Sequence, residues 1–396
     1  MASFQTLPES AKGSPTRFTV SIEEEKLQQM KDLIKLSPIG VGTYENTSKE
    51  GQFGISRKWL ADARAEWAGN FSWRTYEKFI NGFPNYKLDV TDDDGRVYGV
   101  HFVALFSTNP SAVPIAFFHG WPGSFLEFLP LLSLLKERYP TADQLPYHVI
   151  VPSLPGYTFS AKPPLDKDWT YRDSARIMHK LLCELGFEQS GYAVQGGDIG
   201  SVISRTLATT YSQCKVIHVN FSPMLKPEGV EDSSINELEA KQLKRAEEFF
   251  KSGHAYGLEH GTRPATIGLA LSSSPIALLA WIGEKFQEWT DEDLPLTTIL
   301  ESVSLYWLTD TFPTSIYPYR ELFGPDADRG YPYCEKPTGY SWFPMELAPI
   351  PKAWVETTAD LVWHKQHTKG GHFAALERPD ALLDDVEAFI KLAWAE

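Results

Sequence analysis

Strand-like apolar segments alternate with helical segments along much of this chain, and this alternation restricts the fold more than any other feature of the sequence. Between residues 113 and 221, short apolar runs are separated by longer segments whose apolar residues recur at helical spacing. Such alternation is typical of a mostly parallel sheet covered by helices. The expected strands are Tyr86–Thr91, Tyr98–Phe106, Val113–Phe118, His148–Val151, Tyr192–Gln195, Val216–Phe221, Gly339–Phe343 and Leu361–His364. The sequence therefore predicts an α/β fold with an eight-stranded, mostly parallel sheet.

Two regions carry helical patterns without strands between them. The expected helices there are Glu23–Lys35 and Ser56–Asn81 near the N-terminus, and Ile235–Phe250, Thr266–Trp289 and Leu296–Trp307 after the sixth strand. The second block interrupts the strand–helix alternation, so we expect it to form a cap on one sheet. The predicted segments are a helical N-terminal extension (1–85), the first part of the α/β core (86–224), the helical cap (225–325) and the second part of the core (326–396).

Composition excludes several classes of protein. The 396 residues are 42% hydrophobic and 13% aromatic, which is incompatible with a disordered chain. A net charge of −14 repels nucleic acid and anionic lipid, so neither is an expected partner. The three cysteines, Cys183, Cys214 and Cys334, are far apart and indicate neither a disulfide framework nor a thiolate metal site.

No segment has the pattern of a membrane anchor. Residues 1–14 lack the basic and apolar parts of a signal peptide. The most apolar stretch, Ile267–Gly283, is interrupted at Ser272–Pro275, which leaves it shorter than the ~20 residues needed to cross a bilayer. We expect a buried helix or helix pair there, and a soluble, cytoplasmic protein.

A glycine-rich turn follows the fifth expected strand. Gly196-Gly197-Asp198-Ile199-Gly200 has small residues two before and two after its central residue, as a sharp strand-to-helix turn carrying a nucleophile requires. The central residue is an aspartate rather than a serine. Asp198 is therefore either a carboxylate nucleophile or simply the N-cap of the following helix, and the motif alone does not decide between them.

A second turn, His119-Gly120-Trp121-Pro122-Gly123, closes the third expected strand. In a fold of this kind, an oxyanion hole is built from one backbone N–H in this turn and one directly after the nucleophile. The candidates are the amides of Trp121 and Ile199. We expect His119 itself to be hydrogen-bonded into the turn as a structural residue.

The candidate base is His372 in Gly370-Gly371-His372-Phe373, a loop that follows the last expected strand. A base of this kind needs a carboxylate to orient its ring, and Glu346, Glu356 and Asp360 all precede it. Glu346 is preferred because it follows the penultimate strand, although a solvated surface glutamate would give the same pattern. A metal site of His364, His367 and His372 is not expected, since strand alternation sends His364 and His367 to opposite faces.

With these motifs in place, the sequence resembles the microsomal-type epoxide hydrolases, and most of all their soluble fungal members. The likeness covers nearly the whole chain. It includes the two turns above, Phe18–Ile22 with the Trp-rich helices, Pro155–Ser160 and Gly370–Glu377. The resemblance implies an α/β-hydrolase fold, no cofactor, and a homodimer as a plausible assembly. Glu346 stands where several fungal relatives have aspartate, and the anchoring helix of the animal enzymes is absent.

The resemblance also implies two cap tyrosines that hold the epoxide oxygen. Local matches place them at Tyr256 and Tyr319, with Tyr317 as the rival for the second position. The aromatic residues Trp121 and Phe125 suggest binding of an apolar, aryl-type epoxide.

The chemistry expected from these residues is conversion of an epoxide and water to a vicinal diol. Asp198 would attack carbon, and His372 with Glu346 would activate the water that hydrolyses the resulting ester. Alternatives are a haloalkane dehalogenase, which shares an aspartate nucleophile, and a non-catalytic binding protein built on the same scaffold. A serine esterase is disfavoured because the turn carries no serine.

Overall fold

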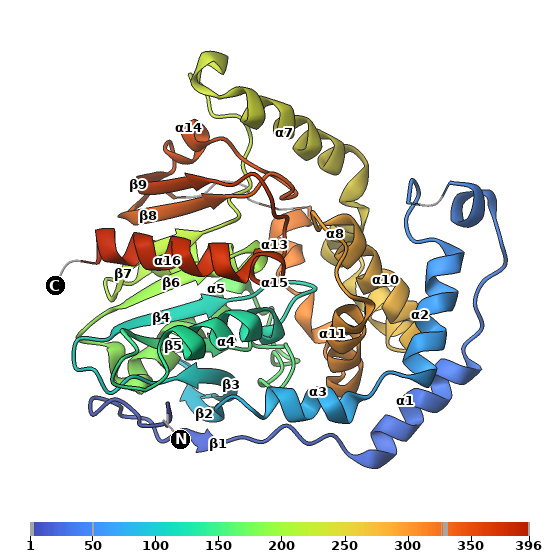
Figure 1. Cartoon of the computed structure of the whole chain (residues 1–396), viewed down its shortest axis with the longest axis horizontal. Helices are drawn as coiled ribbons and strands as arrows, with labels where there is room; N and C mark the ends of the chain where they lie inside the picture. The colour runs from blue at the N-terminus through green and yellow to red at the C-terminus, as the bar shows by residue number, and fades with distance from the viewer. Residues whose placement is uncertain (1–3, 50, 326, 328–331, 395–396) are drawn as a thin grey trace.

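The computed structural model describes residues 4–49, 51–325, 327 and 332–394, and its centre is one twisted sheet (Figure 1). The sheet has nine strands in the order β1-β2-β3-β5-β4-β6-β7-β8-β9. Their bounds are β1 Thr16–Arg17, β2 Asn85–Thr91, β3 Val97–Leu105, β4 Val113–Phe118, β5 Tyr147–Pro152, β6 Tyr192–Gly196, β7 Cys214–Val219, β8 Cys334–Trp342 and β9 Ala359–Gln366. All eight predicted strands are present, and the ninth is the two-residue β1, which is too short to give a sequence pattern.

The sheet is antiparallel along one side and parallel along the other. The pairs β1–β2, β2–β3 and β3–β5 are antiparallel, and every later pair is parallel. Strand β4 lies between β5 and β6, and Phe118 at the end of β4 is level with Gly196 at the end of β6. The two glycine-rich turns identified in the sequence therefore leave the sheet side by side.

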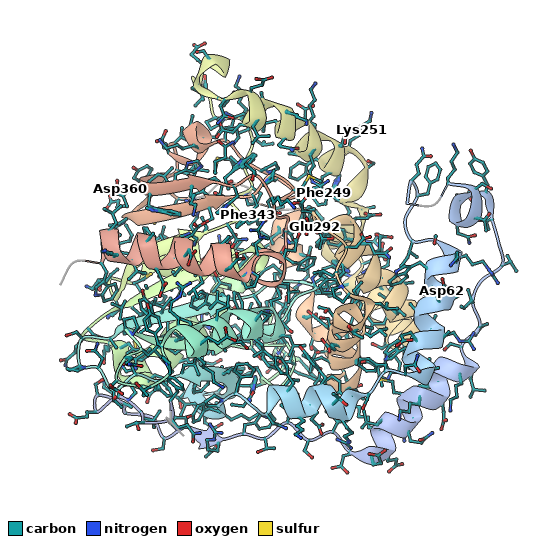
Figure 2. The ribbon with its side chains drawn as sticks, in the orientation of Figure 1. Asp62, Phe249, Lys251, Glu292, Phe343 and Asp360 are labelled. Carbon is teal, nitrogen blue, oxygen red and sulfur yellow. The ribbon has the colours of Figure 1, made fainter. Side chains whose placement is uncertain are left out.

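Helices of the core pack against this sheet. Their bounds are α4 Leu129–Arg138, α5 Tyr171–Leu182, α6 Asp198–Thr210, α14 Lys352–Val355, α15 Ala374–Glu377 and α16 Pro379–Ala393. Helices α4 and α16 contact each other and lie in front of the sheet in Figure 1, while α5 and α6 form a second pair. Side chains fill the space between the sheet and the helices (Figure 2), and the largest fully buried ones include Trp169, Trp289 and Trp342.

The described residues between β7 and β8 contain only helices. They are α7 Glu237–Glu248, α8 Ala255–Thr262, α9 Pro264–Leu271, α10 Pro275–Glu288, α11 Leu296–Thr309, α12 Phe312–Ser315 and α13 Tyr319–Phe323, with short 3-10 and π turns. The predicted helix at Thr266–Trp289 is two helices, because Ser274 caps α10 by accepting a hydrogen bond from the Ala277 amide and Pro275 begins the new helix. This outcome agrees with the helix pair expected for the apolar stretch.

No single helix in the described part of the chain is long and apolar enough to cross a membrane. The pair α9 and α10 meets that length and composition only when taken together, and it is bent by 117°.

The N-terminal helices lie against the helical block rather than apart from it. Helices α1 Glu24–Leu36 and α2 Arg57–Gly69 contact α10, and α3 Trp73–Ile80 contacts α11. The indole of Trp67 donates a hydrogen bond to Ser304 Oγ at 3.0 Å. The expected helical segment Ser56–Asn81 consists of two helices: the chain turns after Gly69, and Ser72 caps α3 by accepting a hydrogen bond from the Thr75 amide.

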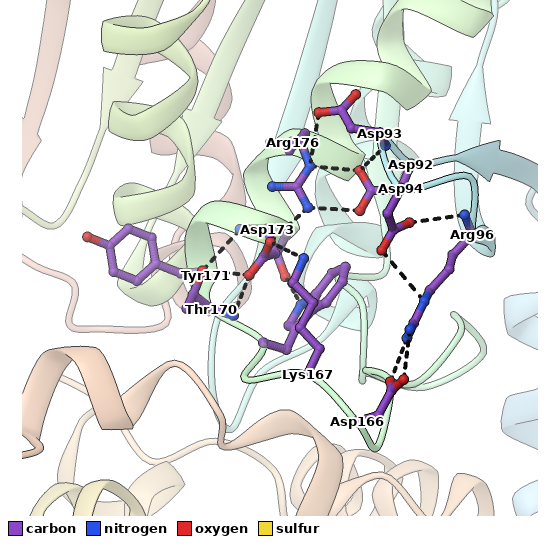
Figure 3. A network of polar contacts seen from close by, with 12 residues as sticks. Asp92, Asp93, Asp94, Arg96, Asp166, Lys167, Thr170, Tyr171, Asp173 and Arg176 are labelled. Atoms are coloured by element: carbon purple, nitrogen blue, oxygen red, sulfur yellow. Dashed lines mark hydrogen bonds and ion pairs between the residues drawn. The ribbon is translucent and has the colours of Figure 1, made fainter.

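A network of ion pairs joins the β2–β3 turn to helix α5 (Figure 3). Arg176 donates to both carboxylate oxygens of Asp92, at 2.7 and 2.8 Å, and to Asp173 at 2.7 Å. The Asp92 side chain is 1% exposed, and hydrogen bonds from Arg176 hold the pKa of its carboxyl below the ordinary value. The buried negative charge of Asp92 is thus compensated by the positive charge of Arg176.

We expect Arg176→Met to lower the free energy of unfolding by about 3 kcal/mol, because it leaves the buried Asp92 charge unpaired. The measurement is urea unfolding at neutral pH. The matched control is Lys12→Met, which breaks an exposed pair with Glu188 and should leave the free energy of unfolding nearly unchanged. Equal effects of the two substitutions would contradict the structural role given to Arg176.

Candidate active site

Asp198 lies in the sharp turn between β6 and α6 with a strained backbone. Its φ of 47° is in the left-handed region, which residues with a side chain rarely adopt. A Cβ on Gly200 would overlap the Phe118 carbonyl, and one on Gly196 would overlap Gly200, so both positions require glycine. Asp198 is not the N-cap of α6, since Gly197 holds that position. Its side chain is therefore not used to cap the helix and can contact other residues of the site.

The Asp198 carboxylate is held from two sides. The Trp121 amide donates a hydrogen bond to Oδ1 at 2.7 Å, and His372 Nε2 lies 3.2 Å from Oδ2. The other ring nitrogen of His372, Nδ1, is 2.5 Å from Glu346 Oε1. The structure therefore brings together the predicted nucleophile, base, acid and one predicted oxyanion donor. Ile199, whose amide is the other predicted donor, directly follows Asp198.

The two loops that carry Glu346 and His372 are joined by backbone contacts. Met345 pairs with Gly371 in an isolated bridge, and the His372 amide donates to the Trp289 carbonyl at 2.9 Å. Glu346 is 1% exposed. The two rival carboxylates weighed in the sequence, Glu356 and Asp360, are exposed to solvent.

Electrostatics favours a charged ring at His372. Burial lowers its pKa, but the charges of Glu346 and Asp198 and their hydrogen bonds outweigh burial and raise the pKa to about 10. In the resting protein the ring is therefore an imidazolium at neutral pH. It becomes a base only when one of the two carboxylates loses its charge.

A cavity of about 450 Å³ opens on one side of Asp198. Tyr256, from α8, and Tyr319, from α13, both line it, and their rings are 5.7 Å apart. Burial raises the pKa of both phenols well above the ordinary value, so both stay protonated at neutral pH. Most other lining residues are apolar: Ile199, Val202, Phe221, Pro223, Met224, Leu225, Leu243, Ala246, Phe249, Phe250, Leu322, Phe323, Leu347, Ile350 and Trp354.

Three aromatic candidates from the sequence lie outside the residues that line this cavity. The Trp121 indole stacks on Tyr256 at 5.4 Å, where it supports the tyrosine. Phe125 is fully buried and packs on His101 at 4.9 Å. Tyr317 shares a 2.6 Å hydrogen bond with Ser174 Oγ. The structure thus gives no support to substrate binding by Trp121 and Phe125, and it favours Tyr319 over Tyr317.

Two residues at the site were not singled out by the sequence. Trp289 supplies the carbonyl that holds the His372 amide, and its ring meets the His372 ring edge-on at 5.1 Å. The Lys285 ammonium lies 4.7 Å from the centre of the Tyr256 ring, in cation–π geometry. Both come from the end of α10 and its exit, which carries no short motif, so only the packing of the cap against the core reveals them.

The structure also shows the contacts of His119 and His367. His119 accepts a hydrogen bond from the Leu154 amide at 3.1 Å, which agrees with the structural role expected for it. His367 Nε2 lies 2.5 Å from Asp385 Oδ2. Within the described ranges, no group of three or more His, Cys, Asp or Glu side chains is arranged to hold a metal ion.

Comparison with known proteins identifies the family. A family profile described as "Epoxide hydrolase N terminus" matches residues 15–128, and one described as "alpha/beta hydrolase fold" matches residues 113–224. A protein of Dothistroma septosporum that is named as an epoxide hydrolase is 47% identical, over 100% of this chain and 94% of that protein. The chain belongs to the microsomal-type epoxide hydrolases.

Solved structures of epoxide hydrolases have the same fold. The enzyme of Aspergillus niger is 49% identical with a TM-score of 0.93, and the match covers 100% of both chains. The juvenile hormone epoxide hydrolase of the silkworm Bombyx mori is 26% identical with a TM-score of 0.84, over 98% of this chain and 96% of the other. The predicted family and α/β-hydrolase fold are confirmed, and the protein is an epoxide hydrolase rather than a dehalogenase or a non-catalytic scaffold.

We expect Asp198→Asn to lower the pKa of His372 from about 10 by about 1–3 pH units, because it removes one of the two carboxylates that stabilise the imidazolium. The measurement is a pH titration of the ¹⁵N-labelled histidine rings by NMR. Glu292→Gln removes an exposed carboxylate paired with Lys369 and serves as control, with no expected change at His372. An unchanged pKa in Asp198→Asn would disprove the electrostatic coupling.

Proposed function

We propose that this epoxide hydrolase converts small apolar epoxides to vicinal diols through a covalent ester on Asp198. The observation that carries the proposal is the position of this carboxylate. It faces Tyr256 and Tyr319 across the cavity and contacts the His372–Glu346 pair through its Oδ2 atom. An electrophile in the cavity thus meets a nucleophile and two acids, and a base is in place for the second step.

In the first step, Asp198 Oδ2 forms a bond to one ring carbon while the bond from that carbon to the epoxide oxygen breaks. The oxygen would otherwise become an alkoxide, a poor leaving group, so it accepts hydrogen bonds and then a proton from the tyrosine pair. Oδ1 stays on the Trp121 amide and becomes the carbonyl oxygen of the ester. The product of this step is a hydroxyalkyl ester.

In the second step, water adds to the Cγ atom of Asp198. Esterification has removed the negative charge of Asp198, so the pKa of His372 falls and the imidazolium releases its proton to solvent. The neutral ring then accepts a proton from the attacking water, with Glu346 stabilising the imidazolium that forms again. The oxyanion that forms at Oδ1 is stabilised by the Trp121 amide, with the Ile199 amide proposed as the second donor. The ester C–O bond then breaks, and the departing alkoxide takes the proton of the Asp198 carboxyl group, which frees the diol and the carboxylate. His372 is again an imidazolium, and the tyrosinate regains a proton from solvent.

The cavity favours apolar substrates of modest size. A volume of about 450 Å³ lies in the range of small-molecule sites, and aromatic and aliphatic side chains form most of its wall. We propose epoxides with an aryl or short alkyl substituent, which would lie against Phe221, Phe249 and Phe323. Water is the second substrate; assembly as a homodimer stays a prediction.

We expect His372→Gln to form the ester and then stall, because alkylation does not need the base and hydrolysis does. Intact-mass spectrometry should show an added mass equal to that of the epoxide, located on the peptide containing Asp198. Asp198→Ala is the control and should neither gain mass nor form diol. In the wild type, one turnover in ¹⁸O water should label the Asp198 carboxylate, and label found instead in the first diol would exclude the ester.

We expect Tyr256→Phe and Tyr319→Phe each to slow ester formation by about 10²–10⁴-fold, because each removes an acid that stabilises the developing alkoxide. The measurement is the single-turnover rate of ester formation, observed in the His372→Gln background. Tyr317→Phe is the matched control and should react within about twofold of its parent, since its hydroxyl is bonded to Ser174. A large loss of rate in Tyr317→Phe but not in Tyr319→Phe would assign the role of second acid to Tyr317 instead of Tyr319.

A further inference from the structure

A second, much smaller cavity lies on the other side of Asp198. Its volume is about 20 Å³, which is enough for one water molecule but not for an organic substrate. Asp198 is the one residue that lines both this cavity and the 450 Å³ cavity. His372 lines the small cavity, whereas Tyr256 and Tyr319 line the large one. The base and the two acids therefore act on different faces of the same carboxylate.

The small cavity is lined by a carboxyl group that has no role in the two steps proposed above. Glu127 lines it together with Asn220 and the backbone of the His119–Gly123 turn. The Ser124 amide donates a 3.0 Å hydrogen bond to Glu127 Oε1. A side chain on Gly123 would overlap that oxygen, so the turn leaves space that the carboxyl group fills.

We propose that this cavity is the binding site of the hydrolytic water and that Glu127 holds the water together with His372. The inference rests on the proposed ester mechanism and adds a residue to its second step. One hydrogen of the water is donated to His372 Nε2 and the other to a Glu127 carboxyl oxygen. A lone pair of the water is then directed at the Asp198 Cγ atom, on the face opposite the bound diol portion.

The charge of Glu127 suits this position. Burial raises its pKa to about 8, with the charge of Asp198 raising it further and that of His372 opposing this. At neutral pH the group is therefore mostly uncharged and adds no third negative charge beside Asp198 and Glu346. Its carbonyl oxygen still accepts a hydrogen bond. Phe118, Phe128, Phe373 and Leu382 are apolar residues of the same wall, so Asp198, Glu127, His372 and Asn220 are among its few polar side chains.

Glu127 also has a structural contact, which the test must separate from water binding. It forms a capping box with Ser124, whose side chain accepts a hydrogen bond from the Leu126 amide. Ser124→Ala removes that side-chain contact and keeps the Ser124 amide bound to Glu127. It is therefore the matched control for a purely structural effect. Glu127→Leu removes both carboxyl oxygens at similar side-chain size, whereas Glu127→Gln keeps the carbonyl oxygen that would accept a hydrogen bond from the water.

The test measures the two steps separately in the full-length enzyme with styrene oxide as the probe. Rapid-quench mass spectrometry follows formation and decay of the ester, and steady-state kinetics gives kcat and kcat/KM. For Glu127→Leu we expect ester decay to slow at least about 10-fold, with ester formation and kcat/KM within about twofold of wild type and kcat and KM lowered together. Glu127→Gln, which keeps a carbonyl oxygen, should decay within about twofold of the wild-type rate. Ser124→Ala should lose some thermal stability but keep both rates within about twofold.

Each other outcome overturns the inference. Decay of the ester at the wild-type rate in Glu127→Leu would remove Glu127 from the hydrolytic step. A parallel loss of ester formation and kcat/KM, or the same loss of rate in Ser124→Ala, would make its role structural. Failure of His372→Gln to form any ester would instead overturn the proposed function itself, and this result is read independently of Glu127.

Discussion

The hydrogen bond from the Trp121 amide to Asp198 Oδ1 is the contact on which the rest of the site depends. It exists because β4 and β6 are neighbours in the sheet, so that the turns after them meet. The turn at Asp198 can approach closely only because Gly196 and Gly200 have no side chains. The strained backbone places the carboxylate away from helix α6 and between two cavities. Pairing of β4 with β6 thus brings the Asp198 carboxylate to the Trp121 amide.

Low polarity around this carboxylate makes its few charged contacts strong. His372 is 5% exposed and lies between two carboxylates, which together keep its ring an imidazolium at neutral pH. The cap contributes directly to this arrangement. The Trp289 carbonyl holds the His372 amide, and Arg245 of α7 donates to the Glu346 carbonyl at 3.1 Å. The helical block therefore helps to hold the proposed catalytic residues in place and does not only cover the cavity.

Much of the fold was predictable because strands and helices bury their apolar residues at different spacings. All eight predicted strands occur, with ends shifted by a few residues, as for β7 and β8. The differences from the expected segments fall where a local contact overrides the wider pattern. Ser72 and Ser274 each cap a new helix inside a segment whose periodicity continues across the break. A two-residue strand such as β1 has no periodicity to detect, and only its pairing with β2 defines it.

The sequence by itself determined the α/β class, the family, and the candidates Asp198, Glu346 and His372, because turn geometry and chain order restrict which residue types can occupy those positions. Tertiary structure decided the roles of residues whose function depends on where the side chain points. It directed the Trp121 indole onto Tyr256, Phe125 into the core, and Glu127 into the small cavity. No spacing rule specifies these directions, because they follow from the contact between the cap and the core, which brings together side chains far apart in the chain.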